Sequence, residues 1–140
     1  MLVSNFFLNV NFHYGILHPP SFLATYSRWW SQRRETPSSH SKNCLSLTIL
    51  VLRICATSTQ FLAGPMQAQV ESELGDTVHN LSKSCQHAAD EVSSSQAFGI
   101  DALINAQQRF LSATWLKTNA EFTKSWYELS TSAIHLQEFC

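Results

Sequence analysis

The longest apolar stretch of the chain, Cys44–Leu62, shapes the interpretation of all 140 residues. Its apolar residues recur at helical spacing on two faces: Leu45, Ile49, Leu52 and Ala56 on one, Leu47, Leu50, Val51 and Ile54 on the other. A helix that is apolar nearly all round belongs in the middle of a helical protein. Arg53 cuts the run far short of the roughly 20 residues of a membrane span. The β-branched residues in Thr48–Leu52 leave a buried strand as the alternative.

Helical spacing continues on both sides of this stretch. Before it, Leu2–Ile16 predicts an apolar-rich helix that ends at Gly15, and Pro20 or Ser21 opens a second helix that ends near Gln32. Gly64-Pro65 predicts the end of the central helix, because glycine suits the position after a helix and proline cannot continue one.

The second half of the chain predicts further helices that are closed or opened by capping residues. Met66–Leu74 precedes an interruption at Gly75, and Asp76 is the expected cap of a helix that carries Val78 to Val92. Ala102–Leu116 follows, and a Thr-x-x-Glu capping box at Thr118–Glu121 predicts a last helix that reaches Leu136.

The pattern as a whole predicts an all-α chain of about six helices in hairpins. Two connections are polar: Arg33–Asn43, which we expect to be a mobile polar loop at 33–43, and the serine-bearing Ser93–Gly99.

Composition changes this picture in one respect, since charged residues are only 14% of the chain. About 25% is usual for a soluble domain, so much of this surface is expected to contact something else. The net charge of −1 gives no signal for nucleic acid or for a membrane. Residues 1–55 carry a surplus of four positive charges and the remainder a net charge of −5, so the two halves are expected to attract each other.

The sequence contains few residues with the spacing of a catalytic or metal-binding site. The four cysteines, Cys44, Cys55, Cys85 and Cys140, form no C-x-x-C pair and are interpreted as buried reduced thiols. His87 and Glu91 lie four residues apart and could share a metal, but without a third ligand an ordinary surface pair is the better interpretation. The sequence therefore predicts no catalytic, cofactor-binding or metal-binding residue.

Arg28-Trp29-Trp30 and Arg33-Arg34 mix cations with aromatic rings, as proteins that bind single-stranded nucleic acid do. The alternative is that the tryptophans cover the end of the core while the arginines lie in solvent. We favour the alternative and predict no DNA-binding residue.

The order of these motifs resembles the regulatory, or middle homology, domain of fungal binuclear zinc-cluster transcription factors, including the xylanolytic activator group. The resemblance rests on Phe6-Phe7, Val10-Asn11, Tyr14, Leu17–Phe22 and Tyr26, then Leu52–Ala56 and Gln60–Leu62, Leu81-Ser82 and His87–Ala89, Gln107-Gln108 and Phe110-Leu111, and Trp126, Leu129, Ala133-Ile134 and Gln137-Glu138. Each motif is unspecific alone, but their order runs nearly end to end.

The resemblance implies a nuclear regulator of transcription that acts through contacts with protein partners and, in some members, with a metabolite. The six-cysteine zinc module of the family has no counterpart here, so we expect no bound cofactor, only indirect contact with DNA, and no membrane. The family domain continues beyond Cys140. Residues 1–140 therefore resemble its N-terminal part, from a truncated protein or a partial gene model.

Two other function classes remain open: a stand-alone helical interaction module or dominant-negative fragment, and, least favoured, an enzyme or small-ligand protein. The last helix carries Phe122, Trp126, Leu129, Ala133 and Ile134 along one side. If no further helices cover that side, we expect an exposed apolar patch and a chain that is marginally stable or self-associating.

Overall fold

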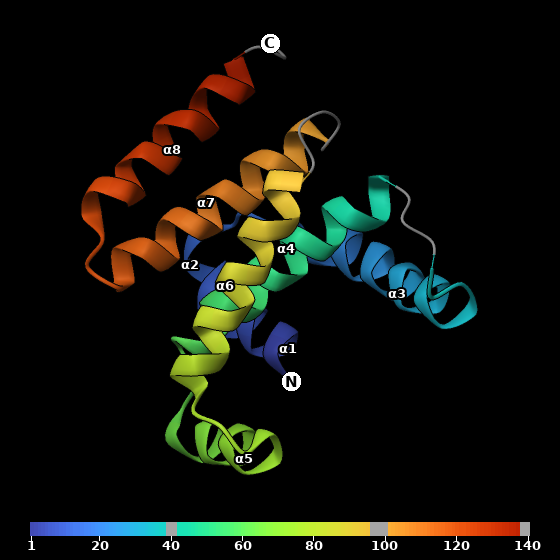
Figure 1. Ribbon diagram of the computed structural model, residues 1–140, viewed down its shortest axis with the longest axis vertical. Helices are drawn as coiled ribbons and strands as arrows, with labels where there is room; N and C mark the ends of the chain where they lie inside the picture. The colour runs from blue at the N-terminus through green and yellow to red at the C-terminus, as the bar shows by residue number, and fades with distance from the viewer. Residues whose placement is uncertain (39–41, 96–100, 138–140) are drawn as a thin grey trace.

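The computed structural model describes residues 1–38, 42–95 and 101–137, and every element within them is helical (Figure 1). The elements are α1 (Leu2–Phe6), the π-helical turn η1 (Phe7–Asn11), α2 (Phe12–Tyr14), α3 (Pro19–Glu35), α4 (Lys42–Thr59), α5 (Gly64–Leu74), α6 (Val78–Ser95), α7 (Ala102–Thr118) and α8 (Phe122–Gln137). The all-α prediction is confirmed. The strand alternative is excluded because residues 48–52 lie inside α4.

Helix α4 runs through the middle of the molecule and packs against α1, α3, α6 and α7 (Figure 1). Ile49, Leu50 and Ile54 lie at its centre and are almost fully buried. Polar residues of α4 are buried as well, among them Arg53 and Ser58. Ser58 accepts a hydrogen bond from the amide of Asn5 at 2.9 Å, which ties α1 to α4.

The central helix ends at Thr59, earlier than predicted. The N–H groups of Gln60 and Phe61 donate to carbonyls three residues back, which tightens the last turn. Gly64-Pro65 therefore does not stop α4; it opens α5, with Ala63 as its N-cap. The reason is that the first turn of a helix needs no N–H from proline.

The N-terminal helical run is continuous through η1 and ends at Gly15 as predicted, with a left-handed φ of 58°. Asn11 then fixes the turn that follows. Its Nδ2 donates to the carbonyl oxygen of Leu17 and its Oδ1 accepts from the Leu17 N–H, both at 2.9 Å. This double hydrogen bond directs the chain into α3.

Helix α3 begins at Pro19 and continues through Glu35, so residues 33–35 of the predicted polar loop are helical. Residues 42 and 43 belong to α4. Residues 39–41 lie outside the described residues, and the predicted mobility of the loop therefore remains a prediction. The Ser93–Gly99 connection is also shorter than predicted, because α6 extends through Ser95, and residues 96–99 lie outside the described residues.

Two predicted caps are wrong. The Thr77 hydroxyl, rather than Asp76, accepts from the Asn80 N–H at 3.2 Å at the start of α6. The carboxylate of Asp76 binds the Thr77 N–H and the Asn80 side chain instead. The predicted Thr118–Glu121 box is absent because Thr118 is still part of α7, where its hydroxyl donates to the Thr114 carbonyl oxygen.

The aromatic residues of α3 form a row of contacting rings. Phe22 and Tyr26 stack at 5.7 Å, and Tyr26 and Trp29 stack at 5.9 Å between centroids. Trp29 is buried, as predicted for the tryptophans at this end of α3, but Trp30 is 44% exposed. Arg28, Arg33 and Arg34 are exposed, as predicted, and the guanidinium of Arg33 lies 4.9 Å from the centre of the Trp29 ring.

Candidate functional site: the apolar face of α8

The last two helices form an antiparallel hairpin in which α8 lies alongside α7 at the edge of the molecule (Figure 1). Their contact is lined by small side chains, all buried: Ala106 and Ala113 on α7, and Ser125 and Ser132 on α8. Both pairs are spaced by seven residues, or two helical turns. Small residues let two helices approach closely, and this line of contact is called the small-residue seam below.

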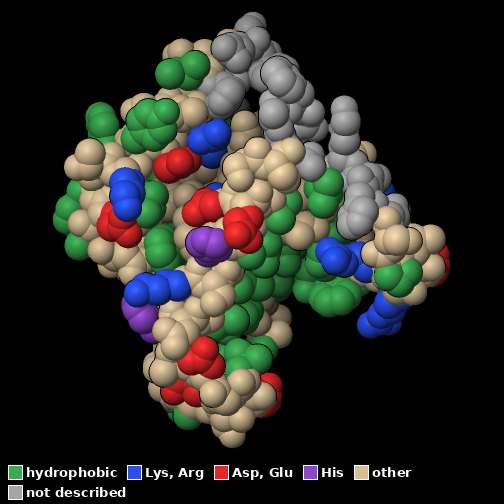
Figure 2. Space-filling view, viewed as in Figure 1, with side chains coloured by type: hydrophobic (Ala, Val, Ile, Leu, Met, Phe, Trp, Pro, Cys, Tyr) green, Lys and Arg blue, Asp and Glu red, His purple; other side chains and the backbone are tan. Residues whose placement is uncertain are grey.

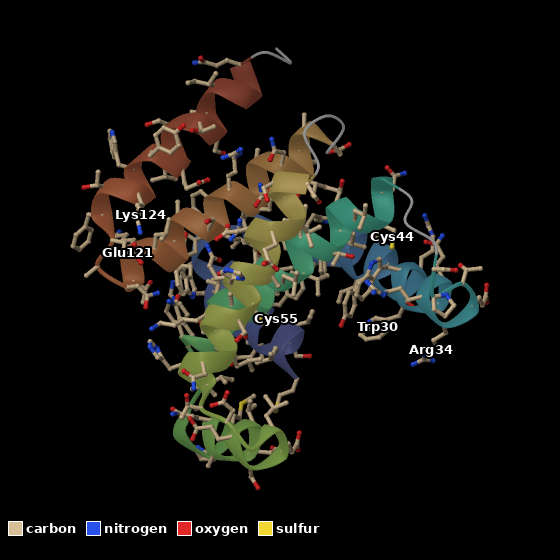
Figure 3. The ribbon with its side chains drawn as sticks, viewed as in Figure 1. Trp30, Arg34, Cys44, Cys55, Glu121 and Lys124 are labelled. Carbon is tan, nitrogen blue, oxygen red and sulfur yellow. The ribbon has the colours of Figure 1, made fainter. Side chains whose placement is uncertain are left out.

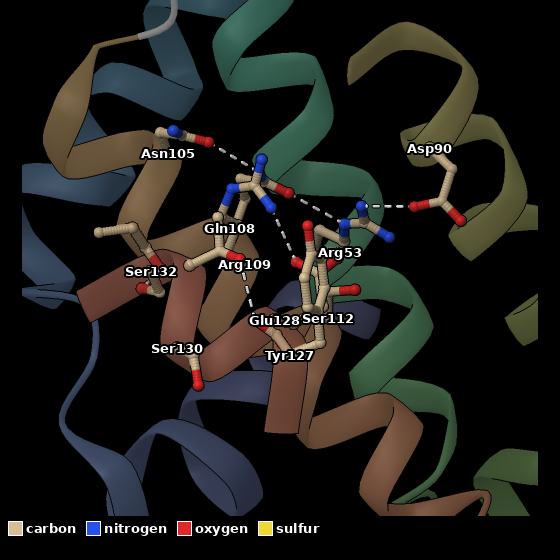
Figure 4. A network of polar contacts seen from close by, with 12 residues as sticks. Arg53, Asp90, Asn105, Gln108, Arg109, Ser112, Tyr127, Glu128, Ser130 and Ser132 are labelled. Carbon is tan, nitrogen blue, oxygen red and sulfur yellow. Dashed lines mark hydrogen bonds and ion pairs between the residues drawn. The ribbon is translucent and has the colours of Figure 1, made fainter. Parts of the chain in front are cut away.

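Hydrogen bonds from α8 to the backbone of α7 hold the seam together. The Ser125 hydroxyl donates to the Ala113 carbonyl oxygen at 2.8 Å, and the Ser132 hydroxyl donates to the Ala106 carbonyl oxygen at 3.2 Å. The side chains of Arg109 and Glu128 add an ion pair at 3.1 Å, shown in Figure 4. Helix α8 is thus attached through its small and polar residues.

The apolar residues of α8 consequently point elsewhere. Phe122 is 63% exposed and Trp126 is 74% exposed, and Leu129 and Ala133, at the same helical spacing, are exposed as well. These four residues are called the α8 apolar face. Tyr127 and Ile134 are exposed beside it. The predicted exposed apolar side of the last helix is confirmed at these positions.

The turn between α7 and α8 fixes the direction in which the α8 apolar face points. Ala120 adopts a left-handed φ of 61°, an uncommon conformation for a residue with a side chain. The Glu121 N–H donates to the Leu116 carbonyl oxygen at 2.9 Å and closes the turn. Glu121 also forms an ion pair with Lys124 at the N-terminal end of α8 (Figure 3).

A buried polar network lies beneath the hairpin and was not foreseen from the sequence. Arg53 of α4 is 4% exposed, and its Nη2 lies 2.7 Å from Oδ1 of Asp90 on α6 (Figure 4). Its Nε donates to Oε1 of Gln108 on α7 at 3.2 Å. The only signal in the sequence was a single arginine within an apolar run, since its partners lie 37 and 55 residues away.

His87 and Glu91, the two residues that could share a metal, have no third ligand beside them among the described residues. His87 and Glu91 lie 3.7 Å apart on exposed side chains, as an ordinary surface pair does. Within residues 1–38, 42–95 and 101–137, no group of three or more His, Cys, Asp or Glu side chains could hold a metal ion.

The cysteines of the described residues, Cys44, Cys55 and Cys85, are half-buried, and Cys55 and Cys85 form no disulfide. Burial, together with the neighbouring Cys85 thiol, raises the pKa of Cys55 to about 12. Burial also raises the pKa of Cys85. Because the thiolate is the reactive form, Cys55 and Cys85 are poor nucleophiles at neutral pH. Cys140 lies outside the described residues.

None of the described helices combines the length and the hydropathy that crossing a membrane requires.

Comparison with known proteins gives a consistent result. The family model of the fungal specific transcription factor domain matches residues 3–138. The chain is 26% identical over 139 residues to the probable transcription factor sol4 of Alternaria solani. This match covers 98% of this chain and 24% of that protein. It is 28% identical over 91 residues to the transcription factor xilB of Penicillium rubens, covering 65% of this chain and 13% of that protein. The chain thus matches a quarter or less of the length of these relatives, and no solved structure matches it significantly.

Proposed function

Because the chain belongs to the fungal specific transcription factor domain family, we propose that it regulates transcription by binding a protein partner on the α8 apolar face. The observation that carries this proposal is the exposure of Phe122 and Trp126 on a helix whose small polar residues are already packed against α7. Large exposed aromatic residues on a well-anchored helix are typical of protein-binding surfaces.

An amphipathic helix of the partner fits this surface best. The α8 apolar face runs along the helix with apolar side chains every three to four residues, which is the spacing that a second helix presents in return. Trp126 would be the central contact, since buried tryptophans contribute strongly to interface affinity. The partner is then another part of a transcription factor, a co-regulator or a second copy of this chain.

This proposal assigns the chain to the nucleus and gives it no catalytic role. It also makes contact with DNA indirect, because a net charge of −1 provides little electrostatic attraction for phosphates. No zinc cluster or other cofactor is assigned to the residues of this chain.

A reporter assay tests the proposal. The chain is fused to an unrelated DNA-binding domain, and the output of a reporter gene is compared with that of the DNA-binding domain alone. We expect the fusion to change the output and the double variant Phe122→Ser/Trp126→Ser to abolish the change. Phe12→Ser serves as the matched control, because Phe12 is an even more exposed aromatic residue but lies on α2.

Two results would contradict the proposal: a fusion with no effect on the reporter, or a double variant that behaves like the parent. A stand-alone interaction module rests on the same exposed face. It is distinguished by a partner that binds the chain through Trp126 while the reporter output stays unchanged.

A further inference from the structure

A cavity of about 790 Å³ opens between α6, α7 and α8. Small-molecule sites in proteins usually measure about 300–1,000 Å³, so its size suits a small ligand. Figure 2 shows acidic, basic and histidine side chains gathered over α6 and the neighbouring α8. None of the residues of the α8 apolar face lines this cavity, which makes it a separate site.

The apolar part of the cavity is aromatic. Trp115 of α7 lines it and is only 7% exposed. Its indole Nε1 donates to the Ser82 hydroxyl oxygen at 2.8 Å, so the ring is held in a fixed orientation. Tyr127 of α8 also lines the cavity. These two aromatic side chains provide contact surface for a ligand that carries a ring.

The buried base of the cavity contains a polar group with unused capacity. Gln86 is 6% exposed and lines the cavity, and its Nε2 donates to the Ser112 hydroxyl oxygen at 2.9 Å. Its Oε1 accepts no hydrogen bond from any described residue. Leaving a buried acceptor unpaired costs about 1–3 kcal/mol. A ligand with a hydroxyl or N–H group is therefore favoured over a purely apolar one.

The charges at the rim are paired, with one exception. Three lining acids have cationic partners: Asp90 pairs with Arg53, Glu128 with Arg109, and Glu121 with Lys124. His87 lies beside Glu91. Lys83 lines the cavity one helical turn from His87 and has no ion-pair partner among the described residues. Among the lining residues, Lys83 therefore carries the charge without an ion-pair partner, which favours an anionic ligand at that position.

We propose that this cavity binds a small aromatic carboxylate that also carries a hydrogen-bond donor. The carboxylate lies at Lys83, the ring contacts Trp115 and Tyr127, and the donor is directed toward Oε1 of Gln86. The ligand would connect α6 to α8, which is otherwise attached through α7. This inference does not depend on the proposed function, because it involves no residue of the α8 apolar face.

The probe for the test is 4-hydroxyphenylacetate, which combines a carboxylate, one ring and a hydroxyl donor. Its neutral isostere, 4-hydroxyphenylacetamide, is the control ligand. Binding is measured by titration while the Trp115 indole N–H signal is followed by NMR, with the signal assigned from the variant Trp115→Phe. We expect saturable binding of the acid, a shift of the Trp115 signal, and affinity for the amide about tenfold weaker.

Lys83→Met tests the charge, with Lys117→Met as the matched control because Lys117 is an exposed lysine of α7 that does not line the cavity. We expect Lys83→Met to weaken binding of the acid about tenfold and Lys117→Met to leave it unchanged. The proposal is overturned if the acid does not bind saturably at millimolar concentration, if acid and amide bind equally, or if both lysine variants behave alike.

Phe122→Ser/Trp126→Ser separates the two proposals. This double variant is expected to lose reporter regulation and to keep binding of the acid. Loss of acid binding in this variant with the fold retained would contradict the assignment of the ligand to the cavity.

Discussion

Arg53 introduces a guanidinium into the helical core, and its partners show how such a charge is tolerated. Asp90 supplies the opposite charge from α6, while Gln108 accepts from Nε and the Gln86 backbone carbonyl accepts from Nη1. The side chain of Asp90 is 60% exposed, so water also reaches this end of the pair. The sequence places Arg53 in an apolar run but cannot identify these acceptors, which come from two other helices.

Removing the countercharge of Arg53 should destabilise the fold. We expect Asp90→Ala to lower the free energy of unfolding by about 2 kcal/mol, because it leaves a buried guanidinium without a carboxylate, while the exposure of Asp90 limits the loss. Glu91→Ala is the control, since Glu91 is an exposed neighbour on α6. Chemical denaturation monitored by circular dichroism measures both.

The double variant Arg53→Met/Asp90→Ala should be more stable than the sum of the two single variants predicts, because it removes both charges. Equal stability of Asp90→Ala and Glu91→Ala would show that the buried ion pair contributes nothing measurable.

Cys55 makes stability depend on pH in the alkaline range. Its pKa is about 12 in the folded chain and near 9.0 when unfolded, so the unfolded state releases the thiol proton first. Below pH 9 both states keep the proton, and as pH rises above 9 the folded state loses stability. Between pH 9 and 10 this loss amounts to about 1 kcal/mol.

The measurement is the difference between the parent and Cys55→Ala, whose free energies of unfolding should converge as the pH rises from 9 to 10. Cys44→Ala is the control, because Cys44 is also a half-buried cysteine of α4. A parent and a Cys55→Ala variant that change in parallel with pH would contradict the assigned pKa.

At the scale of the element, the attachment of α8 depends on side chains too small to dominate a hydrophobic pattern. The periodicity of Phe122, Trp126 and Leu129 correctly predicts a helix with these residues on one side. It does not reveal that the helix packs through Ser125 and Ser132 instead.

The ends of helices are also hard to predict from the sequence. At the start of α6, Thr77 and Asp76 are both acceptable caps, and only local hydrogen bonding selects Thr77.

A bulky residue in the small-residue seam should separate the hairpin. We expect Ser132→Leu to lower the free energy of unfolding by about 2 kcal/mol, since the larger side chain meets the Ala106 backbone at the contact. Ala133→Leu, one residue further along α8 and exposed, should change stability by less than about 0.5 kcal/mol. Thermal or denaturant unfolding measures the difference, and equal effects of the two leucines would contradict the seam.

For the whole molecule, the sequence is sufficient to predict the all-α architecture, because helical periodicity is a local property that each segment carries separately. The central position of α4 follows as well, since an apolar helix must be surrounded. The arrangement of charges across the cavity between α6 and α8 does not follow, because it depends on three helices that meet only in the folded chain.

Exposure of the α8 apolar face should make the isolated chain self-associate. We expect the mass measured by light scattering to rise with concentration, and the variant Phe122→Lys/Trp126→Lys to suppress the rise and to reduce binding of a hydrophobic dye. Phe12→Lys, at another exposed aromatic residue, should leave both unchanged. A parent chain that remains monomeric without binding the dye would show that the α8 apolar face does not drive self-association.

The π-helical turn Phe7–Asn11 indicates that the N-terminal helix can lose one residue without changing which side chains face the core. In such a turn residues five apart share a face, and here Asn5 and Val10, like Phe6 and Asn11, are buried together. An ordinary α-helix brings residues four apart together. Shortening the turn by one solvent-exposed residue, Leu8, would therefore convert it into α-helix and keep all four buried side chains facing the core. The π turn is thus equivalent to a one-residue insertion, and a chain lacking Leu8 should fold with the Asn11–Leu17 hydrogen bonds intact.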